Sequence, residues 1–292
     1  MEAVRVQAEV VANGIHFPEG PVWCPDGSLV VTSVSAGALY RVDLEEGLSH
    51  LLADTNGGAN GAVPASDRGF VVAQNGGIDL RSTGVIPDAP PSRKAAPGLQ
   101  RVRPDHSVEY LCSDGFHAPN DLAVGADGTI YFTDPGHFPP PDPSIGRVMA
   151  RGPDGTVRTF ADDFWYCNGI AVETGGSIVV VEQRGLLRLS PDGSERQWVI
   201  ENLGPGAGDG FCLDQDGRFY VASTVEHGIR VVERTGQVVD FLPIPGDGLT
   251  TNCCFGGGDL RTLFATDGLP GRVVAFEGMP TPGLPMIPWP AP

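Results

Sequence analysis

Short apolar runs and polar turns alternate along the whole chain, and one fourteen-residue unit occurs six times without internal gaps. Each unit begins with a carboxylate or carboxamide residue, continues into an apolar run, turns at a segment rich in Asp and Gly, and ends on a second apolar run. We call the first residues the lead residues, and they are Glu19, Asn60, Asn120, Asn168, Asp209 and Asn252. The second runs end at Thr32, Ala73, Thr133, Val181, Ala222 and Ala265.

Each unit predicts a β-hairpin. In the third unit, Leu122–Val124 and Ile130–Phe132 flank an Asp-Gly turn, in which Gly accepts the positive φ that tight hairpins need. The lead residues are 41, 60, 48, 41 and 43 residues apart, which matches the roughly 40–50 residues of a four-stranded propeller blade. The longest interval holds an insertion rich in Pro and Ala near Thr83–Leu99. The pattern therefore predicts an all-β, six-bladed β-propeller.

The two ends of the chain carry separate predictions. After the run Arg272–Phe276 the sixth unit has no obvious fourth strand, and the alternating run Val4–Val11 is expected to supply it. Such pairing would close the ring and remove exposed strand edges. Residues 1–292 are predicted to form a single propeller domain. The Pro-rich tail 279–292 cannot form a ladder strand, so we expect a solvent-exposed or surface-draped end, with an oligomer arm as the alternative.

Charge and composition exclude several partners. The net charge is −17, whereas nucleic acids and anionic membrane surfaces are bound by clustered Lys and Arg. No apolar run approaches about 18 residues and no N-terminal signal is recognised, so we expect a cytoplasmic protein. The six cysteines lie in or beside apolar runs without a C-x-x-C pattern, and we expect buried free thiols, not disulfides or zinc ligands.

The lead residues also predict a metal site. The first strand of each propeller blade lines the central channel, so six equivalent residues converge near the axis. Two of them are carboxylates, which repel each other when buried unless a cation lies between them. Oxygen ligands favour calcium, with magnesium, manganese or zinc as alternatives. Asn and Asp before Gly are also common turn formers, but six residues in register favour a site.

Several motifs resemble the gluconolactonase/regucalcin (senescence marker protein, luciferin-regenerating-enzyme-like) family, in order along nearly the whole chain. They are Phe17–Trp23, Pro119–Val124, Tyr131–Gly136, Asn168–Val172, Asp209–Asp214 and Thr251–Leu263. The resemblance implies a six-bladed propeller with a divalent metal ion on its axis. It implies Glu19, Asn168 and Asp209 as metal ligands, with Asn120 as a further ligand or substrate contact. Diisopropylfluorophosphatase and related phosphotriesterases share this plan.

One position departs from the family pattern. Sugar-lactone members commonly carry an Arg two residues before the Asn of the Asn-Asp motif, where it holds substrate oxygens. Here that position is Ala118, with His117 beside it. A hydroxyl-rich aldonolactone therefore loses one expected anchor, and the sequence favours a less polar lactone or another ester-like substrate.

The chemistry that the resemblance implies is metal-assisted opening of a lactone ring by water. We expect Asp209 to act as the general base and Asp121 to support catalysis by orienting the ligands. The predicted substrate contacts are Asn60, His117, Asp134, His137, Glu182 and Asn252. Asp134 and Glu182 are also candidates for the base, with turn caps as their structural alternative, and the loop histidines could simply be solvated.

Other functions fit parts of the same pattern. A phosphotriesterase-like or other ester hydrolase could use the same metal, and a calcium-binding regulatory propeller would need no catalysis. A non-hydrolytic relative such as strictosidine synthase is disfavoured because all four family ligands are retained. The absence of a Gly-x-Ser-x-Gly motif counts against a serine hydrolase. The expected partner is thus a small-molecule lactone or ester.

Overall fold

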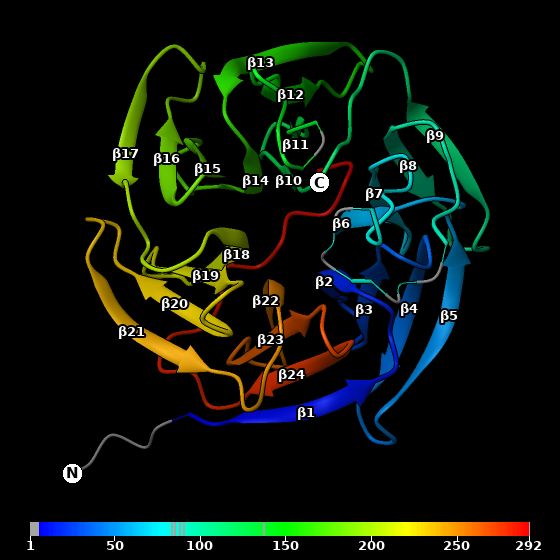
Figure 1. Ribbon diagram of the computed structural model, residues 1–292, viewed down its shortest axis with the longest axis vertical. Coiled ribbons are helices and arrows are strands. Elements are labelled where there is room, and N and C mark those ends of the chain that lie inside the picture. The colour runs from blue at the N-terminus through cyan, green and yellow to red at the C-terminus, as the bar shows by residue number, and fades with distance from the viewer. Residues whose placement is uncertain are drawn as a thin grey trace.

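The computed structural model describes residues 6–82, 84, 86–87, 89, 91–136 and 138–291. Six four-stranded antiparallel sheets form a ring around a central channel (Figure 1), which confirms the predicted all-β, six-bladed propeller. No helix in the described part of the chain is long and apolar enough to cross a membrane.

Each blade runs from an inner strand at the channel to an outer strand at the rim. Blade 1 contains β2 (Pro18–Trp23), β3 (Leu29–Ser33), β4 (Ala38–Asp43) and β5 (Leu48–Asp54); blade 2 contains β6 (Ala59–Pro64), β7 (Phe70–Gln74), β8 (Gly98–Val102) and β9 (Val108–Cys112); blade 3 contains β10 (Leu122–Val124), β11 (Ile130–Asp134), β12 (Gly146–Arg151) and β13 (Val157–Phe164). Blade 4 contains β14 (Cys167–Val172), β15 (Ile178–Glu182), β16 (Gly185–Leu189) and β17 (Arg196–Ile200); blade 5 contains β18 (Gly208–Leu213), β19 (Phe219–Ser223), β20 (Gly228–Val232) and β21 (Val238–Pro243); blade 6 contains β22 (Thr250–Gly256), β23 (Thr262–Asp267), β24 (Arg272–Phe276) and β1 (Ala8–Asn13).

The N-terminal strand closes the ring, as the alternating run near the N-terminus predicts. β1 pairs antiparallel with β24, with Ala8 opposite Phe276 and Asn13 opposite Arg272. It lies at the outer edge of blade 6 (Figure 1). The strand extends two residues beyond the predicted run, because Ala12 is buried in a core cluster. Residues 1–5 lie outside the described part of the chain.

The core lies between the blades. The second strand of each of the first five blades, such as β3 and β19, is buried along its whole length. Both faces of such a strand are covered by neighbouring blades, so its sequence is a continuous apolar run without alternation. Tyr220, Phe255 and Phe276, for example, join one cluster that spans blades 5 and 6.

Glycine lets the inner strands approach one another at the lead residues. A Cβ atom on Gly20 would lie 2.6 Å from the carbonyl oxygen of Asn60, and one on Gly210 would lie 2.0 Å from Cγ of Asn252. Gly61 and Gly169, which also follow lead residues, have equally close neighbours in the next blade. At these four positions any side chain would collide with the adjacent inner strand, so the Gly is required by packing.

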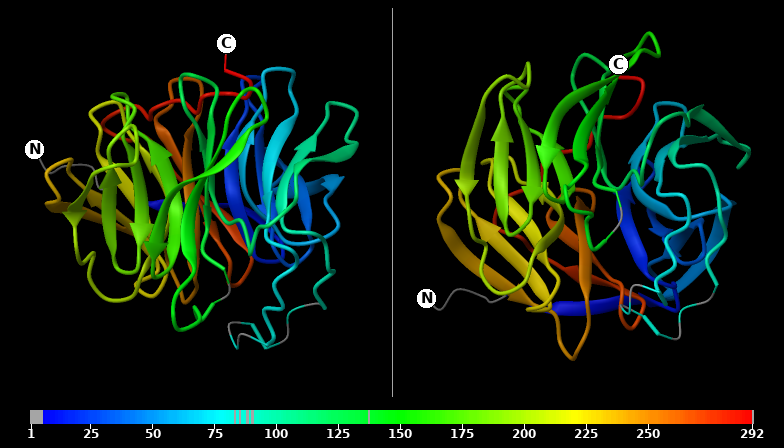
Figure 2. Two further views of the ribbon diagram at one scale, coloured as in Figure 1. Left: turned by 90° about the horizontal axis from the view of Figure 1, so that it is seen from above. Right: turned by 45° about the horizontal axis from the view of Figure 1, so that its top comes forward.

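The C-terminal tail takes a path that the sequence did not predict. It forms no regular strand in its described part, as expected, but it runs across one end of the channel and not around the outside (Figure 1). The N–H of Leu284 donates to the carbonyl of Leu213 in blade 5 (2.8 Å), and the N–H of Trp289 donates to that of Pro64 in blade 2 (2.9 Å). The left view of Figure 2 shows the tail on one face and the β7–β8 connection on the other. All six cysteines are free thiols, as expected.

Deleting residues 1–11 tests the closure of the ring. The deletion removes most of β1 and uncovers β24, in which Val273–Phe276 are buried. We expect the free energy of unfolding to fall by roughly 3 kcal/mol or more, as for other large core losses. Thermal melting measures the effect, and Val10→Ala, which trims a side chain that is 43% exposed on the same strand, is the control. An unchanged melting curve for the deletion would refute the closure.

Candidate functional site

A bulge in the inner strands turns the lead residues toward the channel. In blade 1 the pairing passes from Glu19 opposite Thr32 to Val22 opposite Val30, so two residues of β2 face a single residue of β3. The inner strands β6, β14, β18 and β22 have the same kind of register shift at their lead residues. An extra residue bends a strand and redirects the neighbouring side chains. In β2, β6, β14 and β18 a Gly follows the lead residue and is the sequence signature of this bulge. In β22 the shift lies between Thr250 and Asn252, and Cys253 follows the lead residue.

Asn252 links carboxylates from two other blades. Its Nδ2 donates to Oε2 of Glu19 (2.9 Å) and to Oδ2 of Asp121 (3.2 Å), and its Oδ1 accepts the N–H of Cys253 (2.8 Å). Blades 1, 3 and 6 therefore meet at a single amide. The sequence predicted Asn252 as a substrate contact, but the structure places its side chain between two acidic residues.

Burial raises the pKa of both carboxylates. It raises the pKa of Glu19 to about 7, and the nearby charge of Asp121 adds to the effect, although hydrogen bonds from Gly20 and Asn252 oppose it. Burial likewise raises the pKa of Asp121 to about 6, against hydrogen bonds from Asn252 and Leu122. Neither acid forms an ion pair with a described Lys or Arg residue.

Asp209 belongs to the same group of acids. Burial, and then the charges of Glu19 and Asp121, raise its pKa well above the ordinary value, while a hydrogen bond from the Asn168 side chain lowers it. Asp209 and Asn168 keep part of their surface accessible, whereas Glu19 and Asp121 are buried. Asp209 is thus the acid of this cluster that solvent reaches most easily.

Two amide oxygens in the cluster have no hydrogen-bond partner among the described residues. They are Oδ1 of Asn168 and Oδ1 of Asn60, and both atoms are buried. Buried polar atoms are nearly always paired in native proteins, so unpaired acceptors beside buried acids fit the donor set of a hard cation. The structure does not itself show the predicted metal site, because no group of three His, Cys, Asp or Glu side chains among the described residues has suitable geometry. The predicted ligand set is of another kind, since it contains two carboxylates (Glu19 and Asp209) and two amides (Asn120 and Asn168).

Asp134 and Glu182 accept hydrogen bonds from backbone N–H groups. Asp134 is fully buried and accepts the N–H groups of His117 (3.0 Å) and Ala118 (2.7 Å), while Arg147 donates to its other oxygen (2.7 Å). Glu182 accepts the N–H groups of Trp165 and Tyr166 (2.7 and 3.2 Å). Each acid thus holds the segment that leads into the lead residue of its own blade, which favours the turn-capping alternative over substrate contact.

Asp267 holds the backbone in the same way in blade 6. Oδ1 of Asp267 accepts the N–H of Leu249 (2.9 Å), which precedes Asn252. Its Oδ2 is bound by Arg272 (2.7 Å) and by Nε2 of His227 (2.9 Å). His227 therefore stabilises this face of the ring and is not free to contact a substrate.

A mouth pocket opens on the face of the ring where the inner strands begin. It has a volume of about 300 Å³, and Asn75, Lys94, His117 and Phe138 are among the residues that line it. His117 was predicted as a substrate contact, and the pocket gives its side chain access to a ligand. His137, which was also predicted, lies outside the described residues.

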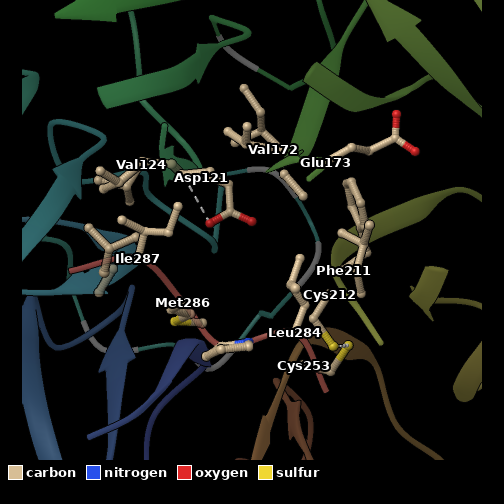
Figure 3. Close-up of a pocket in the computed structure, with 18 of the residues that line it drawn as sticks. Asp121, Val124, Val172, Glu173, Phe211, Cys212, Cys253, Leu284, Met286 and Ile287 are labelled. Atoms are coloured by element: carbon tan, nitrogen blue, oxygen red, sulfur yellow. Dashed lines mark hydrogen bonds between the residues drawn. The ribbon is translucent and has the colours of Figure 1, made fainter. Parts of the chain in front are cut away.

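A larger cavity of about 610 Å³ extends from the cluster toward the opposite face. Its wall is mainly apolar and includes Val124, Val172 and Phe211, and Leu284–Ile287 of the tail close its far end (Figure 3). Asp121 points into this space from the wall (Figure 3). The larger cavity therefore reaches the cluster at Asp121 and Asn252, while the mouth pocket lies on the face where the inner strands begin.

Tyr166 is a residue of this site that the sequence did not single out. Burial raises the pKa of its phenol, and the charges of Asp209 and Glu19 contribute, so the ring lies near both acids. Tyr166 stands two residues before the lead residue Asn168, the same offset as Ala118 from Asn120. This shared offset is the sequence signal that could have identified Tyr166 as a residue of the site. The bridging contact of Asn252 had none, because it depends on three distant segments.

Comparison with known proteins relates the chain to a lactonase family. The family described as SMP-30/Gluconolactonase/LRE-like region matches residues 17–268. A gluconolactonase of Zymomonas mobilis is 24% identical over 283 residues, which cover 87% of this chain and 77% of that protein. A regucalcin of Sus scrofa is 33% identical over 97 residues, which cover 28% of this chain and 31% of that protein.

Solved structures share the fold. A gluconolactonase of Xanthomonas campestris superposes with a TM-score of 0.75 at 23% identity, covering 94% of this chain and 91% of that one. A calcium-binding regucalcin of Agrobacterium tumefaciens gives a TM-score of 0.78 at 16% identity, with 98% of both chains covered. The match over residues 17–268 supports a lactone hydrolase at the family level. The chain belongs to the SMP-30/gluconolactonase/LRE-like family.

Proposed function

We propose that this chain is a metal-dependent hydrolase that opens a lactone ring. The observation that carries the proposal is the group of three acids, Glu19, Asp121 and Asp209. Burial raises the pKa of all three, and the charges of neighbouring acids add to the effect for Glu19 and Asp209. Such a group is unfavourable unless protons or a cation neutralise it. Membership of the family supports the cation.

The proposed ligands are Glu19, Asn120, Asn168 and Asp209. Their side chains offer carboxylate and amide oxygens, and Oδ1 of Asn168 is buried without a partner among the described residues. This donor set suits calcium best, and magnesium, manganese or zinc are the alternatives. When bound, a divalent ion would polarise the lactone carbonyl and stabilise the charge that develops on its oxygen.

The surrounding residues position this set. Asp209 is the proposed general base, because it is partly accessible and its raised pKa makes it a better proton acceptor near neutral pH. Asp121 acts as a positioning residue through Asn252, which ties it to Glu19. Asp134 holds the backbone that leads into Asn120.

The substrate enters from the mouth pocket. His117 remains a candidate contact there, because it lines the pocket. Asn60 remains a candidate contact in the channel, because its amide oxygen has no partner among the described residues. Ala118 leaves the pocket without the family's Arg, so we propose a lactone ring with fewer hydroxyl groups than an aldonolactone. A phosphotriesterase-like or other ester hydrolase is the enzymatic alternative.

A calcium-binding role without catalysis is the second candidate function. The matches to regucalcins support it, because one solved relative is described as a calcium-binding protein. The two functions differ in one respect, since a regulatory protein would bind the ion and turn over no lactone.

The raised pKa values predict how stability depends on pH in the metal-free protein. An acid whose pKa is raised on folding stabilises the fold below its unfolded pKa, and that stability is lost as the pH rises through its folded pKa. For Asp121 the pKa rises from 3.8 to about 6, so the loss between pH 4 and 7 is on the order of 3 kcal/mol.

Replacing Asp121 by Asn should remove this loss. In chelator, the melting temperature of Asp121→Asn relative to the wild type should rise between pH 4 and 7, as thermal melting at several pH values will measure. Glu45→Gln, at an exposed site, controls for the loss of one negative charge. Parallel pH profiles for wild type and Asp121→Asn would contradict the burial of an unpaired acid.

Turnover of a lactone panel tests the proposed activity. The panel spans aldonolactones and lactones with few hydroxyl groups, assayed with chelator and then with calcium, magnesium, manganese or zinc. We expect activity that chelation removes and a metal restores, and a loss of at least about 100-fold in kcat for Asp209→Asn, the lower end of the range for acid–base catalysis. Activity on aldonolactones alone would overturn the interpretation of Ala118. Binding of calcium without turnover of any lactone would favour the regulatory function.

A further inference from the structure

The mouth pocket gathers hydrogen-bond donors from two blades. The β7–β8 connection supplies Asn75 and Lys94, and the segment before β10 supplies His117. Both segments lie on the face where the inner strands begin. The pocket is therefore built mainly by the β7–β8 connection, to which the insertion near Thr83–Leu99 contributes Lys94, Ala95 and Pro97. The proposed chemistry does not use this connection.

The pocket adjoins the acidic cluster. Phe138 lines the pocket, and its ring packs edge-on against that of Tyr166 with 5.3 Å between ring centroids. Tyr166 stands two residues before the lead residue Asn168. In blade 2 the N–H of Asn75 donates to the carbonyl of Gly58 (3.0 Å), two residues before the lead residue Asn60. A substrate held in the mouth pocket can thus extend toward the lead residues.

Asn75 presents an unpaired donor. Its side chain is 4% exposed, and its Oδ1 accepts the N–H groups of Gly77 (3.0 Å) and Ile78 (3.2 Å). These bonds fix the orientation of the amide. Its Nδ2 is buried without a partner among the described residues, and Asn75 is one of the residues that line the pocket. A buried N–H₂ group that lacks an acceptor is costly.

Lys94 presents a second donor with a positive charge. It is the only lysine in the sequence, and its Nζ donates to the carbonyl of Gly77 (2.7 Å). No described carboxylate lies within ion-pair distance of it. The preceding Arg93 is instead paired with Asp54 (2.7 Å) and anchors the connection to blade 1. Arg93 thus holds the backbone of the connection in place, while the ammonium group of Lys94 keeps two N–H protons that can donate to a ligand.

We propose that Asn75 and Lys94 form a subsite for a carboxylate group on the substrate, so that the natural substrate is a lactone whose ring carries a carboxylate. This inference rests on the proposed lactone hydrolysis, and it specifies the substrate class. Lys94 then replaces, from a different blade, the positive charge that Ala118 removes. The subsite binds the end of the substrate that does not react.

A carboxylate fits this subsite better than a phosphate. The two oxygens of a carboxylate match one ammonium and one amide donor, whereas a dianionic phosphate usually needs an Arg or several cations. Asp79 also lines the pocket, with its Oδ1 accepting the N–H of Arg81 (3.2 Å). Its negative charge and the net charge of −17 further disfavour a dianion.

The test compares two substrates that differ in one charge. A γ-butyrolactone carrying a ring carboxylate and its neutral N-methylamide are assayed with metal-supplemented enzyme, and the wild type should prefer the carboxylate. Lys94→Gln should lower the ratio of the two kcat/KM values roughly tenfold to a hundredfold, the range for a hydrogen bond to a charged group. The change should fall on KM, because the contact is the same in the ground and transition states.

Matched variants separate charge from structure. Asn75→Asp keeps the oxygen that Gly77 and Ile78 require but replaces the donor by a negative oxygen, and it should also lower the ratio. Lys94→Arg should restore much of it. Arg103→Gln, which removes an exposed positive charge from the same blade, should leave the ratio unchanged.

A binding measurement separates this inference from the proposed activity. Incorporation of ¹³C-labelled lysine gives a single Cε signal by NMR, since the chain has a single lysine. Glutarate should shift this signal saturably in the wild type and not in Asn75→Asp. A saturable shift without turnover of any lactone would support the subsite and refute the hydrolase. Turnover with no preference for the carboxylate, or a ratio unchanged in Lys94→Gln, would overturn the subsite alone.

Discussion

The close approach of the inner strands at the lead residues is the constraint on which the rest of the structure depends. Six blades can bring six polar side chains to one axis only if their backbones come into contact there. Gly20 and Gly210 make this possible, because a Cβ atom on either would overlap the next lead residue. The bulge that accompanies each Gly turns the lead side chain inward. The repeat therefore determines both the blade number and the crowding of acids on which the proposed cation site depends.

Around this centre, acids have two distinct uses. Asp134, Glu182 and Asp267 accept backbone N–H groups and fix the segments that enter the site. Asp134 and Asp267 also pair with Arg147 and Arg272. Glu19 and Asp121 lack such cations and share the amide of Asn252. Residue type alone does not separate these uses. The separation follows from whether an acid lies at the start of the first strand or at the end of the second.

Much of the fold could be predicted from the sequence, because the repeat is local. The hairpins, the blade number and the closing strand follow from apolar runs and turn residues within each unit. The path of the C-terminal tail could not be predicted, since Leu284 and Trp289 bind blades that are distant in the sequence.

The candidate site was predictable in part. The six lead residues converge as their register implies, and family motifs single out four of them. Asp134 and Glu182 were predicted as substrate contacts or candidate bases, because their position near the mouth was predictable while their backbone partners were not. Tyr166 and the donor pair of Asn75 and Lys94 depend on loop conformation, which short sequence patterns do not encode.

The most direct test of this account is a calorimetric titration of the chelator-treated protein with calcium at pH 6.5 in buffers of different ionisation enthalpy. The account predicts one bound ion per chain and a release of protons on binding, because the acids of the cluster have raised pKa values in the metal-free protein. Glu19→Gln should weaken binding sharply. Binding that releases no protons, or that Glu19→Gln leaves unchanged, would contradict the central claim that the lead residues hold the cation.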